Sequence, residues 1–160
     1  KLKSDIDLKI FRPFTVYGPY SRPDMLFIKY LESYKSKKPF ILFNNGDYIR
    51  DFTYIEDVVK ILVKALKIEK INKNIINICS SEPVSIKKIV YLINKFYKKK
   101  KLINFQNKRK GEMVKTFGDN NYATKIIGKN KFINIETGIV NTIKWYKNYK
   151  NKKNLKFNKF

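Results

Sequence analysis

The sequence predicts an α/β fold, because strand-like and helix-like segments alternate along a chain of one domain's length. The chain has 160 residues, of which 43% are hydrophobic, enough to bury a core. Short runs of β-branched and aromatic residues alternate with longer stretches in which apolar residues recur at helical spacing. The central strands are short and paired, so we expect an α/β scaffold that carries a smaller substrate-covering unit.

The first third of the chain is predicted to hold a strand, a loop, a helix and a second strand. Residues 8–14 alternate and are rich in β-branched and aromatic side chains, which is typical of a strand. Residues 15–24 contain one glycine and two prolines, which predict a loop. Between residues 25 and 34 the apolar spacing is helical, and residues 40–43 form a short apolar strand.

The middle third is predicted to hold a turn, a returning strand and a long apolar helix. Residues 44–47 have turn chemistry, and residues 48–53 follow as a strand. Residues 58–68 are strongly apolar, so we expect a helix that is buried between layers. Glu56 and Asp57 precede it, where a helix N-terminus favours negative charge.

The last third continues the alternation. Residues 75–79 form a short apolar strand, and Ser85 is typical of an N-cap for a helix that reaches residue 97. A strand is expected over residues 102–105, and a short helix over 120–127 is stopped by the glycine that follows. The final helix begins near residue 135 and is expected to fray after residue 149, where the chain turns polar.

The net charge is high, but the kinds of basic residue favour a general compositional bias over a charge-dependent function. The net charge is +23, and only 4 of the 36 basic residues are arginine. Lysine is mixed with asparagine and isoleucine throughout and is spread widely over the helical faces, so we expect a general compositional bias and no nucleic-acid partner. A retained arginine then indicates a position that needs a planar fork of donors. The four arginines are Arg12, Arg22, Arg50 and Arg109.

The residue inventory excludes several kinds of site. The chain has one cysteine and no histidine, so it cannot form an internal disulfide, a His-based triad or a common zinc site. Cys79 lies in an apolar run and is interpreted as a small buried side chain in a reducing compartment. No apolar stretch approaches the roughly 20 residues that span a bilayer, and there is no signal-peptide pattern. We therefore expect a cytoplasmic protein with no membrane partner.

Two longer motifs carry a family resemblance. Residues 12–25 are RPFTVYGPYSRPDM and residues 46–57 are GDYIRDFTYIED, with shorter matches at residues 77–78, 83–85, 110–112, 128 and 136–146. In this order and spacing they resemble the C-terminal half of an extended short-chain dehydrogenase/reductase, of the NAD-dependent epimerase/dehydratase family. Within that family, the TVYGP and RPDM motifs are most similar to those of UDP-glucuronate 4-epimerases.

The resemblance implies that residues 1–150 hold the last strands of a Rossmann-type parallel sheet, interleaved with a small substrate-binding α/β subdomain. Residues 151–160 are expected to be a basic, frayed tail. The family's glycine-rich dinucleotide turn is not in this sequence, and its catalytic Tyr-x-x-x-Lys pair precedes the strand that begins here at Leu8. Tyr34 and Lys38 have the same spacing but lie at the end of a lysine-rich helix, so we interpret them as a coincidence. We therefore expect a fragment that starts just after the catalytic helix, is inactive alone and contains no catalytic residue. NAD is expected to bind mainly to the missing N-terminal half, and the full-length enzyme to be a homodimer.

The resemblance also assigns roles in binding the nucleotide. Arg50 and Arg109 match the two arginines that hold the diphosphate of the UDP-sugar, for which bidentate cations are suited. Glu112 stands where the family usually has an aspartate that binds the ribose. Ile41 and Phe43 match the segment that binds uracil, with Phe43 supplying the ring.

At the sugar end, the resemblance implies that Thr15 and Arg22 hold the glucuronate carboxylate. Pro13 and Phe14 match positions on the nicotinamide side of the pocket and are the expected cofactor-binding residues. Asp51 is interpreted as structural, like Asp57.

The implied reaction converts UDP-glucuronate to UDP-galacturonate through a 4-keto intermediate. Two alternatives stay open within the family, a nucleotide-sugar 4,6-dehydratase and a UDP-glucuronate decarboxylase. An alternative from another class is a basic module that binds nucleic acid or an anionic membrane. That alternative predicts lysines clustered on one face and binding that falls steeply with salt.

Overall fold

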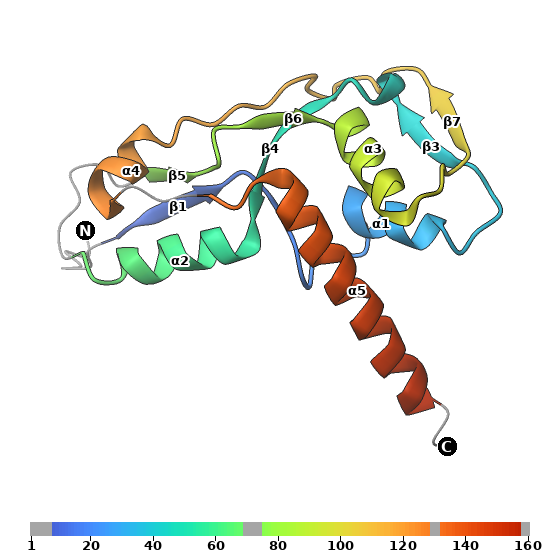
Figure 1. Cartoon of the computed structure of the whole chain (residues 1–160). Helices are drawn as coiled ribbons and strands as arrows, with labels where there is room; N and C mark the ends of the chain where they lie inside the picture. Colours follow the sequence, from blue (N-terminus) through green and yellow to red (C-terminus); the bar gives the residue numbers. More distant parts are fainter. Residues whose placement is uncertain (1–7, 69–74, 129–131, 158–160) are drawn as a thin grey trace, which may run out of the picture.

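The computed structural model describes residues 8–68, 75–128 and 132–157 (Figure 1). The first half contains β1 (Ile10–Pro13), β2 (Thr15–Tyr17), α1 (Leu26–Ser33), β3 (Phe40–Phe43), a 3-10 turn η1 (Asn44–Gly46), β4 (Ile49–Tyr54) and α2 (Ile55–Ala65). The second half contains β5 (Ile75–Ile78), β6 (Pro83–Ser85), α3 (Ile86–Tyr97), β7 (Ile103–Gln106), α4 (Asn121–Ile127) and α5 (Ile135–Phe157). Strands and helices alternate, which confirms the predicted α/β class.

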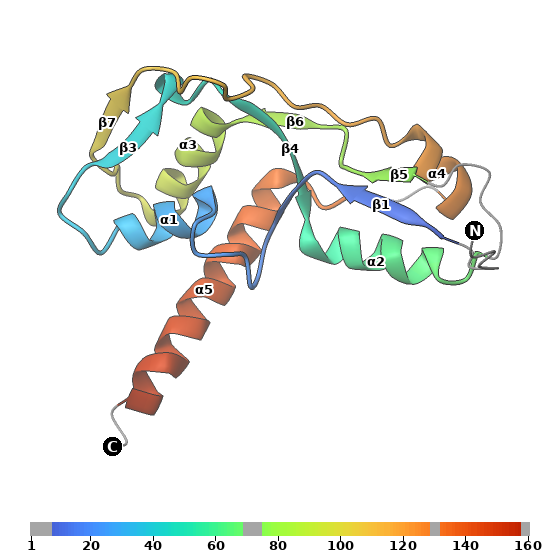
Figure 2. The ribbon, with the colours of Figure 1, turned by 180° about the vertical axis from the view of Figure 1, so that it is seen from behind.

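The strands pair mostly in parallel and join segments that are distant in the sequence. β1 pairs with β5, β2 with β4, and β3 with β7, all in parallel, while β6 adds to β4 in antiparallel orientation. The β1–β5 pair lies at the end of the molecule near α2 and α4, and the β3–β7 pair lies at the other end, near α1 and α3 (Figures 1 and 2). β4 runs between the two ends and pairs with β2 and β6, so it connects them.

Each end has its own apolar core. The larger core packs α1, α3 and α5 around β4 and is rich in aromatic rings, with Tyr17, Phe27, Tyr30 and Phe52 at its centre. The smaller core joins α2, β5 and α4. Because burial of apolar area is the main stabilising contribution to folding, each unit is held chiefly by these contacts.

One close contact fixes α5 against the larger core. Gly138, in the first turns of α5, packs against the hydroxyl group of Tyr17, and a Cβ atom at this position would overlap that hydroxyl. Tyr17 is 1% exposed, and its hydroxyl group has no hydrogen-bond partner among the described residues. Burial raises the pKa of Tyr17, with a smaller contribution from neighbouring Tyr54. The glycine is therefore required by space and not by its backbone angles.

The structure differs from the sequence-based prediction at β2. Residues 15–17 were expected in a loop because a glycine and a proline follow directly. They instead form a strand, since Thr15, Val16 and Tyr17 pair with residues 52–54 of β4. A three-residue strand of this kind is stabilised by its distant partner and not by local sequence.

Two helices also differ from expectation. α2 is buried on one side only, because Val58, Ile61 and Ala65 face the smaller core. Other apolar side chains of the helix and the residue after it are exposed; these are Val59, Leu62, Val63 and Leu66. α5 continues to Phe157, so residues 151–157 are helical and not frayed. No glycine or proline interrupts residues 139–157, so nothing in the sequence stops this helix earlier. Among all the helices of the described ranges, none is long and apolar enough to cross a membrane.

Candidate functional site

A cavity of about 650 Å³ lies between α1, β3, β4 and the segment that follows β7. Six of the residues predicted to bind substrate line it, although they are up to 97 positions apart in the sequence: Thr15, Ile41, Phe43, Arg50, Arg109 and Glu112. A volume of this size is typical of small-molecule sites.

Arg50 is held rigidly in the wall of the cavity. Its side chain is 17% exposed, and Nη1 donates hydrogen bonds to the carbonyl oxygens of Ile49 at 2.9 Å and Val114 at 3.3 Å. Nη2 donates to Oε1 of Glu112 at 3.3 Å, and the guanidinium lies 5.3 Å from the ring centre of Tyr48. The fork is therefore oriented before any ligand arrives, and its charge is paired with a carboxylate.

Arg109 stacks on the aromatic ring expected to hold the base. Its guanidinium carbon lies 3.8 Å from the ring centre of Phe43, within the range of a cation–π interaction. The backbone N–H of Arg109 donates a 3.0 Å hydrogen bond to the hydroxyl of Tyr48. Gly111 then turns the chain with a φ of 78°, which a glycine adopts readily, and brings Glu112 back toward Arg50.

Tyr48 connects the two arginines and was not predicted from the sequence. Its side chain is 5% exposed, its ring lies beside Arg50 and its hydroxyl fixes the backbone at Arg109. The only signal in the sequence is an aromatic residue two positions before Arg50. An aromatic residue at this position is equally typical of a strand with no functional role. Other lining residues in and around α1 were also missed, namely Met25, Lys29, Ser33, Ser36 and Lys38.

The two residues expected to hold a sugar carboxylate are placed differently. Thr15 lines the cavity, whereas Arg22 lies outside its lining with a side chain that is 74% exposed. Nη2 of Arg22 is 2.9 Å from Oδ2 of Asp24 and 4.0 Å from Sδ of Met25, and both of those residues line the cavity. Arg22 is thus at the rim, and its fork already binds a carboxylate.

Pro13 and Phe14 are not in the cavity but at the carboxyl end of β1. Pro13 pairs in register with Ile78 of β5, and the N–H of Phe14 donates a 3.0 Å hydrogen bond to the Ile78 carbonyl. The ring of Phe14 packs against Gly118, where a Cβ would lie 3.0 Å from Cε2. Ligands of open α/β sheets bind beyond the carboxyl ends of parallel strands, which is where these two residues lie.

Asp51 organises the chain around this edge of the sheet. It is fully buried and accepts four hydrogen bonds: from Ser80 N at 3.0 Å, Ser80 Oγ at 2.8 Å, Ser81 N at 3.1 Å and Gly118 N at 3.1 Å. Asp57, 4% exposed, accepts a 2.8 Å hydrogen bond from the backbone that leads into α5. Both side chains are bound within the fold, as the structural interpretation expects.

The four arginines do not gather at one place. Arg50 and Arg109 line the cavity and Arg22 lies at its rim, but Arg12 belongs to β1 and donates a 3.1 Å hydrogen bond from Nε to Oδ1 of Asn77. Binding of the nucleotide sugar therefore does not explain why an arginine stands at position 12. Its fork serves the β1–β5 pair.

Comparisons with known proteins agree with this geometry. The model of the NAD dependent epimerase/dehydratase family matches residues 2–79. A UDP-glucuronate 4-epimerase of Thermodesulfobacterium geofontis is 33% identical over 143 residues, which cover 89% of this chain and 44% of that protein. The chain spans less than half the length of the curated relatives it matches.

Solved structures give the same result. The Bacillus cereus UDP-glucuronic acid 4-epimerase, in complex with UDP-glucuronic acid and NAD, is similar with a TM-score of 0.79 and 32% identity, over 88% of this chain and 45% of that one. An NAD-dependent NDP-hexosamine 5,6-dehydratase of tunicamycin biosynthesis has a TM-score of 0.78 and 28% identity, over 88% of this chain and 46% of that one. These similarities confirm the predicted fold class and the family resemblance.

Proposed function

We propose that this chain belongs to the NAD-dependent epimerase/dehydratase family and is the nucleotide-sugar-binding part of a UDP-glucuronate 4-epimerase, a proposal supported by the family match over residues 2–79 and by the similar epimerases. The full-length enzyme interconverts UDP-glucuronate and UDP-galacturonate through a 4-keto sugar. The chemistry that NAD supplies when bound is uptake and return of hydride at C4. The residues of this chain contribute grip and orientation, which hold the reacting carbon in place.

The observation that carries this proposal is the joint placement of Arg50, Arg109 and Phe43 in one cavity. Two guanidinium groups suit a diphosphate, because each offers a planar pair of donors. The ring of Phe43 offers a flat apolar face to uracil, and Ile41 on the same strand lies beside it. Glu112 offers an acceptor to ribose hydroxyls. One wall of the cavity thus offers a matching group to each part of UDP.

The sugar end is proposed to lie at the rim formed by Thr15 and Arg22. In the structure the fork of Arg22 holds the carboxylate of Asp24 at 2.9 Å. The carboxylate of glucuronate has the same charge and shape, so it can replace Asp24 on this fork. Pro13 and Phe14, at the carboxyl ends of the parallel strands, fit the nicotinamide side of the site. We assign most of the NAD contacts to the rest of the full-length protein.

A dehydratase is the second candidate, because an NDP-hexosamine 5,6-dehydratase is nearly as similar in structure as the epimerase. The substrate carboxylate separates the two functions. A hexosamine offers none, so the grip by Arg22 is useful only to an enzyme of uronic acids. We also propose that the protein is cytoplasmic and that the full-length enzyme is a homodimer.

The diphosphate assignment is tested by measuring UDP affinity of the full-length protein by titration calorimetry. We expect Arg50→Ala and Arg109→Ala each to weaken binding by about 1.5–3 kcal/mol, the usual value of a hydrogen bond to a charged group. Arg12→Ala is the matched control, since it removes the same side chain outside the cavity, and its UDP affinity should be unchanged. Unchanged affinity in both cavity variants would remove the assignment.

The sugar assignment is tested with Arg22→Ala and two substrates. We expect this variant to lose more affinity for UDP-glucuronate than for UDP-glucose, because only the first has a carboxylate. Product analysis by chromatography then shows whether the parent enzyme forms UDP-galacturonate. Equal losses for both nucleotide sugars would show that Arg22 does not recognise the carboxylate.

A further inference from the structure

The end of the molecule that carries α1, α3 and β7 concentrates positive charge. Two connections contribute most of it, residues 34–39 between α1 and β3 and residues 98–102 between α3 and β7, and α5 adds the rest. We call this surface the lysine-rich end; it consists of Lys35, Lys37, Lys38, Lys98, Lys99, Lys100, Lys101, Lys147 and Lys150.

Specific contacts bring the two connections side by side. The hydroxyl of Tyr34 donates a 3.2 Å hydrogen bond to the carbonyl of Lys99, and Nζ of Lys101 donates to the carbonyl of Ser36. The N–H of the first β3 residue also bonds the carbonyl of Leu102 at 2.8 Å. Seven lysines, in two groups that are at least 60 positions apart in the sequence, therefore share one surface.

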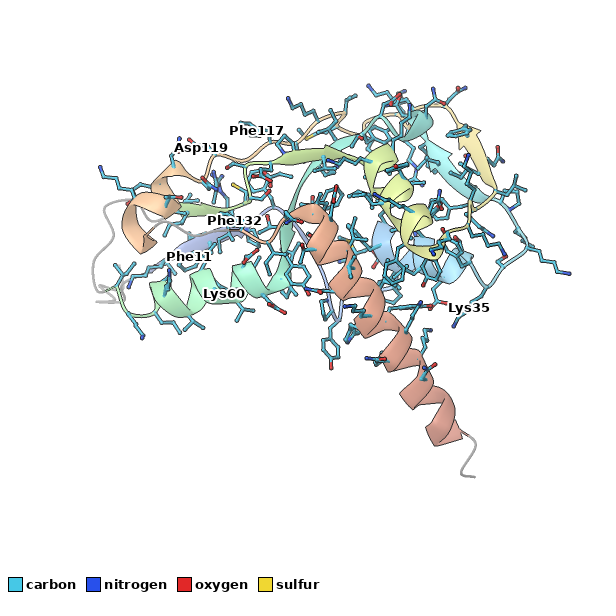
Figure 3. All side chains as sticks on the ribbon, viewed as in Figure 1. Phe11, Lys35, Lys60, Phe117, Asp119 and Phe132 are labelled. Carbon is cyan, nitrogen blue, oxygen red and sulfur yellow. The ribbon has the colours of Figure 1, made fainter. Side chains whose placement is uncertain are left out.

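α5 brings further lysines to the same surface. Nζ of Lys150 lies 2.6 Å from Oε1 of Glu32 in α1, and Nζ of Lys35 lies 5.8 Å from the ring centre of Tyr146 in α5. Figure 3 shows Lys35 beside α1. Nζ of Lys147 lies 5.0 Å from the ring centres of two aromatic residues of α3. These contacts join the helix to both connections.

The positive charge of this end is almost uncompensated. Residues 33–41, 94–106 and 140–157 contain no aspartate or glutamate. Glu32 is the acidic residue that these lysines contact in the described structure, and it is shared by Lys35 and Lys150. Crowding like charges destabilises a folded protein unless an external anion offsets the repulsion. The lysine-rich end is therefore suited to an extended negatively charged partner.

The side chains indicate which kind of anion fits. All nine residues of this surface are lysines, although Lys38 also lines the cavity that contains Arg109. The surface therefore offers mainly flexible point charges and not the bidentate forks that bind individual phosphates in a fixed geometry. Leu102 follows Lys101 directly and is 64% exposed. An exposed leucine gains nothing on a nucleic-acid backbone, but it can enter the boundary between lipid headgroups and acyl chains.

We propose that the lysine-rich end docks the protein on an anionic lipid bilayer, with the lysines against the headgroups and Leu102 inserted between them. This departs from the expectation of no membrane partner and agrees with the alternative of a basic module for an anionic membrane, which predicts clustered lysines. The structure shows them gathered by two connections that are distant in sequence. The proposal does not depend on the enzymatic function, because none of its steps uses the nucleotide.

The test is co-sedimentation of the full-length protein with vesicles of neutral phosphatidylcholine, with or without 30% phosphatidylserine. The unmodified protein should bind the anionic vesicles, and its binding should fall steeply as NaCl rises. The triple variant Lys37→Gln, Lys99→Gln and Lys100→Gln should bind on the order of 100-fold more weakly, at about fivefold for each lysine removed.

The matched control removes the same charge from the opposite end of the molecule. Lys60→Gln, Lys64→Gln and Lys67→Gln alter exposed lysines at α2, where Lys60 lies far from Lys35 (Figure 3). This control should bind anionic vesicles within about twofold of the parent, because these lysines are outside the proposed contact. Circular dichroism establishes that both triple variants are folded.

Three results would overturn the proposal. The first is that the unmodified protein does not bind anionic vesicles at low salt. Equal losses in the two triple variants would show that net charge alone drives binding. Tighter binding to a 20-base-pair DNA duplex than to the vesicles would identify the partner as nucleic acid.

Discussion

Replacing Asp51 with alanine is expected to destabilise the protein by about 4 kcal/mol. The fully buried carboxylate accepts hydrogen bonds from Ser80, Ser81 and Gly118. In the variant, Ser80 N keeps a 3.2 Å bond to Oγ1 of Thr53, so two backbone donors, at Ser81 and Gly118, lose their acceptor. Each such donor left unpaired costs about 1–3 kcal/mol, and the middle of that range gives the expected loss.

Urea denaturation of the full-length protein, followed by circular dichroism, measures this difference. Asp47→Ala is the matched control, because it removes the same group from an exposed turn and should change the free energy of unfolding by less than about 0.5 kcal/mol. Asp51→Asn keeps one acceptor oxygen and should fall between the two. An Asp51→Ala protein as stable as the control would refute the reasoning that this carboxylate ties the segments together.

Three further predictions concern buried or paired side chains. Gly138→Ala should destabilise the protein less in a Tyr17→Phe background, since its Cβ overlaps the Tyr17 hydroxyl; equal losses in urea denaturation would contradict this. Burial raises the pKa of Cys79 to about 11, so a thiol reagent at pH 8 should label the protein only after unfolding, and fast native labelling would disprove it. Burial acts to raise the pKa of Glu32, but the hydrogen bond and charge of Lys150, with contributions from Tyr146 and Lys35, together outweigh it and the pKa is lowered. Glu32→Gln should therefore destabilise at neutral pH, and this difference should vanish as pH falls through the lowered pKa; a difference that persists in acid would exclude the ion pair as its source.

The elements that the sequence predicted well are those fixed by neighbouring residues. β3 has the predicted bounds, Phe40–Phe43, because a short apolar run between a proline and a turn leaves few alternatives. α3 begins after Ser85, whose Oγ accepts a 3.2 Å hydrogen bond from the N–H of Lys88, as expected of an N-cap. β2 was missed because its partner, β4, is about 37 positions away and local sequence says nothing of it.

The candidate site also combines features that the sequence predicts with features that depend on contacts between distant segments. The resemblance identified six residues that line the cavity, whereas Arg22, Pro13 and Phe14 lie outside its lining. It did not predict which side chains pair, since the ion pair of Arg50 with Glu112 and the stacking of Arg109 on Phe43 depend on how β4, β3 and the segment after β7 meet in space. Tyr48 was missed for the same reason, because its role depends on its contacts with Arg50 and with the backbone of Arg109, which the local sequence does not reveal.

Two of the three arginines assigned to the ligand share one property that bears on how the site works. Both already hold an anionic group like the one each is proposed to bind: Arg50 pairs with the carboxylate of Glu112, and Arg22 with that of Asp24. Binding of an anionic nucleotide sugar is then an exchange of one anion for another, and its free energy is the difference between two charged contacts. Because Arg50 is 17% exposed and Arg22 is 74% exposed, the first exchange takes place away from water and the second mostly in it. The diphosphate therefore contributes the larger share of affinity, and the sugar carboxylate contributes selectivity at a small cost.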